Sequence, residues 1–173
     1  GRMLATADDI EVVGFARDGE EGLAMARELQ PDVVTLDVRM PRLGGLETLE
    51  RLMAEQPVPV LLMSTLTQEG AEVTLRGLEL GAMDFVDKSS VQPMSMLSLA
   101  EELVAKIRAL GGARVRSRPR PPQAQAGEGP GRPPAQCVVI GASTGGPTAL
   151  QTVVSGLPAA FRAAVVIVQH IPR

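Results

Sequence analysis

A serine and a histidine near the end of the chain have the types and spacing of a nucleophile and its base. Ser143 lies at the centre of GASTG (141–145), which fits the G-x-S-x-G pattern of a serine on a sharp strand-to-helix turn. His170, the only histidine, follows the apolar run AAVVIVQ (163–169). A strand-helix-strand unit brings its two strand ends to one edge of a parallel sheet, so we expect a hydrogen bond to be within their reach.

The glycine loop around Ser143 is open to two other interpretations. A phosphate-binding loop would end in Gly-Lys-Ser or Gly-Lys-Thr, and a dinucleotide-binding loop would read G-x-G-x-x-G; GASTGGP has neither. The third interpretation is a structural turn without chemistry. Spacing alone favours the nucleophile over the turn, and the turn over the phosphate loop.

Three more side chains with chemical capacity follow apolar runs in the first part of the chain. Asp37 ends one run, Ser64 ends the next, and Lys88 ends the third. Open α/β sheets bind ligands at the carboxyl edge of their strands, where these three side chains would meet. A lone Asp or Lys at such a place is usually a loop residue, but three on successive strands favour a site.

Strands and helices that alternate along the chain must position these residues. Nearly continuous Val, Leu and Ile predict strands, whereas leucines and alanines at helical spacing predict helices. Strands apolar on both faces between amphipathic helices indicate a parallel sheet covered on both sides. The expected strands are 11–16, 32–38, 58–64 and 83–88, and the expected helices are 19–30, 45–56, 68–81 and 94–110.

The composition divides the chain into two α/β segments. Residues 111–136 are almost wholly Gly, Pro, Arg, Gln and Ala without apolar periodicity, which predicts a semi-rigid linker. We therefore expect one domain at 1–110 and the start of a second at 137–173, beginning with a strand, a helix and a strand.

Bulk properties limit the possible partners and the compartment. The net charge is only -3, and the chain has no Trp or Tyr on which bases could stack, so we expect no nucleic acid partner. The single cysteine, Cys137, cannot form an intrachain disulfide. With no signal peptide and no apolar run long enough to span a bilayer, the sequence predicts a cytoplasmic protein without membrane insertion.

The first domain resembles the response-regulator receiver family, which has a flavodoxin-like fold. The resemblance rests on the TLDV strand, the MPxxGG loop, the hydroxyl after the next strand, and the aromatic-then-lysine pattern of the last strand. It implies that Asp37 accepts a phosphoryl group, Ser64 senses it, Phe85 is the aromatic switch residue and Lys88 binds the phosphate. A lysine and a hydroxyl can hold the acceptor oxygens of an acyl phosphate.

The same resemblance implies Mg²⁺ for phosphorylation, with Asp37 and the backbone carbonyl of Arg39 among its ligands. The family takes the remaining ligands from an acidic pair after a first strand, and we expect that strand to precede residue 1. The pair Asp8–Asp9 follows a helix tail and is no substitute. Ser89 stands where the family usually has proline after the lysine, which is a departure in the local loop.

The whole chain resembles the CheB family of chemotaxis protein-glutamate methylesterases: a receiver, a Pro/Arg/Ala-rich linker, then GASTGG and QH-x-P. The resemblance implies a doubly wound parallel α/β methylesterase domain that hydrolyses glutamate γ-methyl esters, and deamidates glutamine, on the cytoplasmic domains of methylated chemoreceptors. A chemotaxis histidine kinase would be the phosphodonor. Ser143 would attack, His170 would carry the proton, and the Thr144 amide would donate to the oxyanion, with no cofactor for the esterase.

We further expect an orienting Asp of the catalytic domain to lie beyond Arg173, so that this chain is a central piece without esterase activity of its own. The alternative function is a response regulator whose second domain binds a ligand or partner without catalysis. The strand-end serine and histidine favour the esterase.

Overall fold

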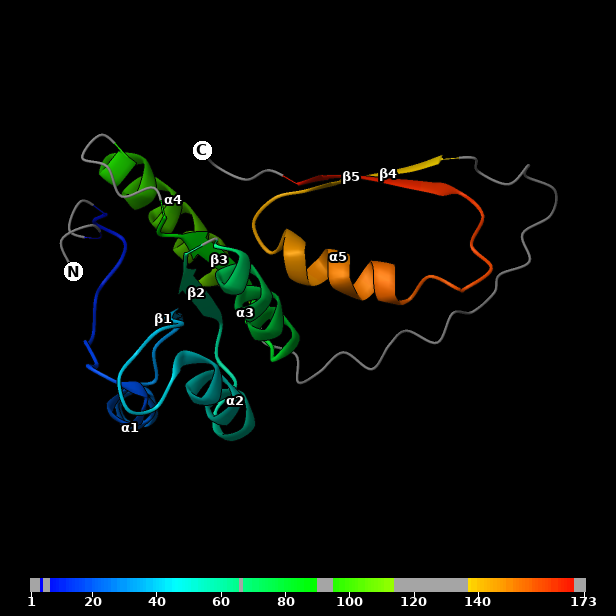
Figure 1. The fold of residues 1–173 in the computed structure, drawn as a ribbon. Coiled ribbons are helices and arrows are strands. Elements are labelled where there is room, and N and C mark those ends of the chain that lie inside the picture. The colour runs from blue at the N-terminus through cyan, green and yellow to red at the C-terminus, as the bar shows by residue number, and fades with distance from the viewer. Residues whose placement is uncertain (1–3, 5–6, 66, 90–94, 114–136, 170–173) are drawn as a thin grey trace.

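The computed structural model describes residues 4, 7–65, 67–89, 95–113 and 137–169, which form two parallel sheets with their helices (Figure 1). The helices of the first segment are α1 (Gly19–Leu29), α2 (Gly45–Glu55), α3 (Gln68–Glu79) and α4 (Ser95–Leu110). Its strands are β1 (Val34–Asp37), β2 (Val60–Ser64) and β3 (Asp84–Asp87). The helices and these three strands were predicted to within three residues at each end.

The first sheet has the order β1-β2-β3 with all strands parallel. Its register pairs Asp37 with Met63 and Ser64 with Asp87. The carboxyl ends of the three strands therefore meet at one edge, as the α/β pattern predicts, and the residues that follow them share that edge.

Helices cover both faces of the sheet. Alternate residues of a strand point to opposite faces, so the same strands contribute to two cores. Leu36, Val60 and Leu62 pack on one face against α1, α2 and α3. Leu61 and Val86 pack on the other face against α4. The helix residues of the two cores are Leu23, Ala26, Leu49, Leu52 and Leu78 on the first face and Leu103 and Leu110 on the second.

Local sequence fixes where the helices beside the carboxyl edge begin. The Thr67 hydroxyl caps α3 by accepting from the Gly70 amide at 3.1 Å. Gly45 opens α2 against the backbone of β1, where an added Cβ would lie 2.2 Å from the Asp37 carbonyl oxygen. The MPRLGG segment thus needs glycine at 45 so that α2 can pack directly behind Asp37.

The strand predicted at 11–16 is wrong. These residues are described, but they form no strand and all six are exposed. Among the described residues, no strand lies beside this segment to pair with its backbone, and an apolar run alone does not make a strand. The preceding turn is held to α4 instead, since Arg108 donates two hydrogen bonds of 2.8 Å to the Asp9 carboxylate and thereby lowers the pKa of Asp9.

The second segment forms β4 (Cys137–Ala142), α5 (Gly146–Ser155) and β5 (Ala164–Gln169), as the sequence predicts. The two strands are parallel, and the register pairs Ala142 with Gln169. Gly146 alone is buried among the described residues of this segment, and Val139 and Val168 are 68% and 60% exposed. Most of the predicted linker, 114–136, lies outside the described residues.

Candidate functional sites at two sheet edges

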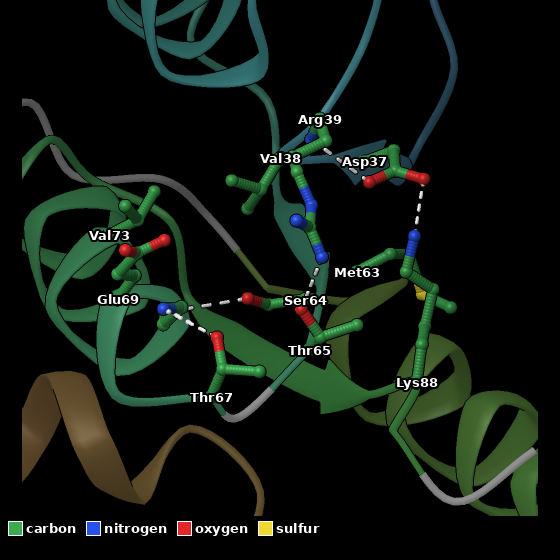
Figure 2. A pocket seen from close by; sticks show the side chains of 11 residues that line it. Asp37, Val38, Arg39, Met63, Ser64, Thr65, Thr67, Glu69, Val73 and Lys88 are labelled. Carbon is green, nitrogen blue, oxygen red and sulfur yellow. Dashed lines mark hydrogen bonds and ion pairs between the residues drawn. The ribbon is translucent and has the colours of Figure 1, made fainter.

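Asp37 and Lys88 form an ion pair at the carboxyl edge of the first sheet. The Lys88 ammonium donates to Asp37 Oδ2, and the Arg39 amide donates to Asp37 Oδ1 at 3.0 Å. The side chains are 39% and 29% exposed, so the carboxylate is held in place yet open to solvent. The sequence predicted that these two residues share an edge, and the structure brings them into contact (Figure 2).

Ser64 lines the same pocket, but its hydroxyl is engaged with α3. The Thr74 hydroxyl donates to Ser64 Oγ at 2.8 Å, and both side chains are buried. The Ser64 hydroxyl also faces the Gly70 carbonyl of α3, 3.5 Å away, so this side chain links the pocket to α3. The pocket is lined by Asp37, Val38, Arg39, Met63, Ser64, Thr65, Thr67, Glu69, Gly70, Val73 and Lys88.

Phe85 and Ser89 lie on β3 and just after it. Phe85 is half-buried against the core between the sheet and α1–α3, and the Lys106 ammonium lies 5.3 Å from its ring centroid. The Ser89 amide donates to Asp87 Oδ1 at 2.8 Å, and its hydroxyl donates to Asp87 Oδ2 at 2.6 Å. A proline at 89 could not donate the first of these bonds, so the serine builds its own turn after Lys88.

Sequence reasoning missed the role of the Arg39 side chain, since only its backbone carbonyl was assigned. The guanidinium donates to the Thr65 hydroxyl at 2.8 Å, across the pocket from the loop after β1 to the end of β2 (Figure 2). A signal was present: a cation two residues after a strand-end Asp lies in the loop that borders the same edge.

The described residues offer few candidate ligands for a metal ion beside Asp37. Asp37 is a hard oxygen donor, but no group of three or more His, Cys, Asp or Glu side chains gathers within the described ranges. The Asp9 carboxylate accepts two hydrogen bonds from Arg108 on α4. Octahedral Mg²⁺ needs more oxygens than one carboxylate and one carbonyl.

The loop around Ser143 turns sharply from β4 into α5, and its two last glycines have structural reasons. Gly145 has φ of 74°, a left-handed conformation that favours glycine. A Cβ on Gly146 would lie 2.3 Å from Gln169 Oε1 and 2.8 Å from the Ala142 Cβ. The Gln169 amide donates to the Ser143 carbonyl at 3.1 Å, which ties the end of β5 to this loop. His170 lies outside the described residues.

The Ser143 loop also contacts the first sheet, at the edge opposite to Asp37. The Gly145 amide donates to Asp84 Oδ2 at 2.8 Å, where β3 begins. The Thr148 hydroxyl lies 3.0 Å from the Ala82 carbonyl oxygen and 3.1 Å from that of Met83, so its one proton is shared between them. A carboxylate at the start of α5 also suits the positive end of the helix dipole.

Asp84 belongs to a buried ionic cluster. Its side chain is 2% exposed, and Lys106 on α4, 11% exposed, lies 3.2 Å away. Lys106 also lies 3.3 Å from the Glu102 carboxylate and donates to the Phe85 carbonyl. The Phe85 amide donates to Asp84 Oδ1 at 2.8 Å, so both carboxylate oxygens of this buried residue have partners.

Comparisons with known proteins agree with this arrangement. Residues 1–101 match the family model of the response regulator receiver domain, and residues 138–173 match that of the CheB methylesterase. Two curated relatives, from Symbiobacterium thermophilum and Lawsonia intracellularis, are each called protein-glutamate methylesterase/protein-glutamine glutaminase. They are 48% and 41% identical over 98% and 99% of this chain, and over 52% and 53% of their own lengths. The chain thus spans about half the length of these relatives.

Solved structures resemble the first segment. The response regulator domain of Thermotoga maritima CheB is 40% identical, with a TM-score of 0.58 over 65% of this chain and 84% of that one. A LuxR-family response regulator from Aurantimonas is 30% identical, with a TM-score of 0.53 over 67% and 77%. In the part of the chain that is described, no helix is both long and apolar enough to cross a membrane.

Proposed function

Because this chain belongs to the response regulator receiver family, we propose that Asp37 accepts a phosphoryl group and that this event regulates a methylesterase built around Ser143. The observation that carries the first half is the Asp37–Lys88 pair at the carboxyl edge, with Ser64 in the same pocket. The second half is supported by the match of residues 138–173 to the methylesterase family model.

The phosphorylation step needs little from the protein beyond position and charge. An Asp37 oxygen attacks the phosphorus of the donor, the bond from phosphorus to the donor's leaving atom breaks, and the leaving group departs with its electron pair. Lys88 then offsets charge on the phosphoryl oxygens. The new acceptor oxygens draw the proton of the Ser64 hydroxyl from the Gly70 carbonyl, which biases the position of α3. Phe85 is the proposed aromatic switch residue.

Mg²⁺ is part of this proposal, and it would neutralise phosphoryl charge when bound. Asp37 and the Arg39 carbonyl would be two of its ligands, together with carboxylates that the described residues do not provide. The donor chemistry suits the ion, but one carboxylate and one carbonyl are fewer oxygens than its octahedral shell requires.

For the esterase, Ser143 would attack the carbonyl carbon of a glutamate γ-methyl ester while His170 takes the serine proton. His170 would return that proton to the leaving methanol, and water would hydrolyse the acyl-enzyme in a second round. The pairing of Ala142 with Gln169, the last residues of β4 and β5, supports this assignment, because Ser143 and His170 come next in the sequence. The Thr144 amide, in the turn before α5, is the proposed oxyanion donor.

The proposed partners rest on the family resemblance of the sequence, and the glutaminase reaction rests on the relatives' names. A histidine kinase would donate the phosphoryl group, and methylated chemoreceptors would be the substrate, with deamidation of glutamine as the related reaction of the same site. A cytoplasmic location remains a prediction from the sequence.

The test of the receiver half is the location of phosphate after incubation with a small acyl phosphate. We expect mass spectrometry, after reductive trapping of the acyl phosphate, to find the label on the peptide that contains Asp37. Asp37→Ala should remove the label, while Asp32→Ala, at an exposed position before β1, should keep it. Label that survives in Asp37→Ala would refute the assignment.

The contact of α5 with the start of β3 supports gating of the esterase by the receiver. In a full-length protein, Thr148→Val keeps the side-chain shape but removes the hydrogen bond to the Ala82 and Met83 carbonyls. One such bond contributes about 1 kcal/mol, so basal methanol release from methylated receptor should rise about 2- to 5-fold without phosphorylation.

The matched control for this prediction is Thr152→Val on the same helix. The Thr152 hydroxyl donates to the Thr148 carbonyl within α5, so its loss leaves the contact with β3 in place. Equal basal rates in both variants would argue against gating through this contact.

A further inference from the structure

Two cationic side chains, and not only Lys88, line the Asp37 pocket. We infer that Arg39 is a second cationic ligand of the phosphoryl group in transit and that it positions small anionic phosphodonors for attack by Asp37. This inference rests on the proposed phosphorylation of Asp37.

Arg39 is held by hydrogen bonds from its backbone amide and from its guanidinium. Its backbone amide donates to Asp37 Oδ1 at 3.0 Å, so the residue cannot move far from the carboxylate. Its guanidinium donates to the Thr65 hydroxyl at 2.8 Å, which holds the side chain across the pocket (Figure 2). The side chain is exposed, so it can turn toward a ligand without disturbing the core.

Among the side chains that line the pocket, Lys88 alone does not balance the charge of a phosphoryl group on Asp37. Two carboxylates, Asp37 and Glu69, and two cations, Lys88 and Arg39, line it. Lys88 is already paired with Asp37, and a phosphoryl group adds close to two negative charges. Of the two cations that line the pocket, Arg39 is the one whose side chain donates to a neutral hydroxyl and not to a carboxylate.

The chemistry of the guanidinium suits this role. Arginine presents a planar fork that binds phosphate oxygens through two parallel hydrogen bonds, and bonds between charged groups are stronger than a bond to a neutral hydroxyl. A phosphoryl group should therefore replace Thr65 as the partner of Arg39. Asp37 attacks phosphorus, the phosphorus–oxygen bond to the acyl group breaks, and the carboxylate of the acyl group leaves with the electron pair.

The experiment measures the phosphorylation rate of Asp37 with acetyl phosphate in the full-length protein. Arg39→Gln should slow the reaction about 5-fold at low ionic strength, mainly through a higher KM for acetyl phosphate. The difference should shrink as salt screens the pocket. Arg39→Lys should keep most of the rate at low salt, because lysine keeps the positive charge. The rate should stay somewhat below that of the unsubstituted protein, because lysine lacks the planar guanidinium that forms two parallel hydrogen bonds. Thr65→Val removes the hydroxyl that the phosphoryl group must replace, so it should speed the reaction slightly while Arg39 is present and leave it unchanged in Arg39→Gln.

Arg51→Gln is the matched control, since it removes one exposed arginine on α2 that pairs with Glu47. A KM effect that depends on salt in Arg39→Gln, but not in Arg51→Gln, supports the inference. Equal kinetics in the two variants overturn it, while label on Asp37 in the unsubstituted protein leaves the proposed function intact. If the unsubstituted protein takes no label on Asp37, the proposed function fails and this inference fails with it.

Discussion

Ser143→Ala is expected to lower methyl-ester hydrolysis by a full-length protein that carries this chain by about 10⁴-fold or more. Removal of a member of a serine-histidine pair in serine hydrolases leaves only the acceleration that comes from the oxyanion site and from binding. The measurement is methanol release from methylated receptor at saturating substrate. Binding of the receptor should persist, because the alanine removes one oxygen and leaves the loop backbone unchanged.

Ser155→Ala serves as the control for this prediction, since Ser155 is an exposed serine at the end of α5. Its activity should match that of the unsubstituted protein. A Ser143→Ala protein with full activity would show that Ser143 is not the nucleophile and would favour the interpretation of the glycine loop as a structural turn.

Lys106→Met is expected to lower the free energy of unfolding by about 3–5 kcal/mol, because it leaves the carboxylate of Asp84 buried without its cation. Methionine has a similar length and would fill the space beside Phe85. The measurement is urea unfolding followed by circular dichroism. The free energies of unfolding can be compared only between variants whose free energy depends on urea concentration with the same slope.

The double variant Asp84→Asn/Lys106→Met should recover much of this loss, because a neutral amide costs less to bury than an unpaired charge. Arg108→Met on the same helix is the control. It breaks an ion pair with Asp9 in which both side chains are more than half exposed, and it should therefore change stability far less. Equal losses from Lys106→Met and Arg108→Met would show that the cluster is not a buried ionic site.

The sequence could predict those strands and helices that are recognisable from the apolar pattern of their own residues. β1, β2 and β3 are apolar on both faces, and the helices between them carry a clear helical period, so their parallel pairing could be predicted. The segment at 11–16 has the same apolar character but forms no strand. A strand depends on a partner backbone, and the residues of one segment carry no information on whether a partner lies beside it.

The same distinction applies to the sites. Asp37, Ser64 and Lys88 were predicted together because each follows a strand of one parallel sheet, and topology places such residues at one edge. The bond from Gly145 to Asp84 joins residues 61 positions apart in different segments, and no periodicity encodes it. The Arg39–Thr65 bond was missed because both residues lie in loops, where side-chain direction depends on the backbone path.

Strand β3 has Asp84 at its first residue and Lys88 just beyond its last, so the α5 contact and the phosphate pocket lie at the two ends of a strand about 13 Å long. If phosphorylation weakens the hold of β3 on α5 by some factor, thermodynamic reciprocity requires that loss of the α5 contact favours the phosphorylated state by the same factor. A receptor that draws α5 away from β3 would then favour the phosphorylated state of the protein at equilibrium. Substrate and phosphodonor would act as each other's effectors through a four-residue strand.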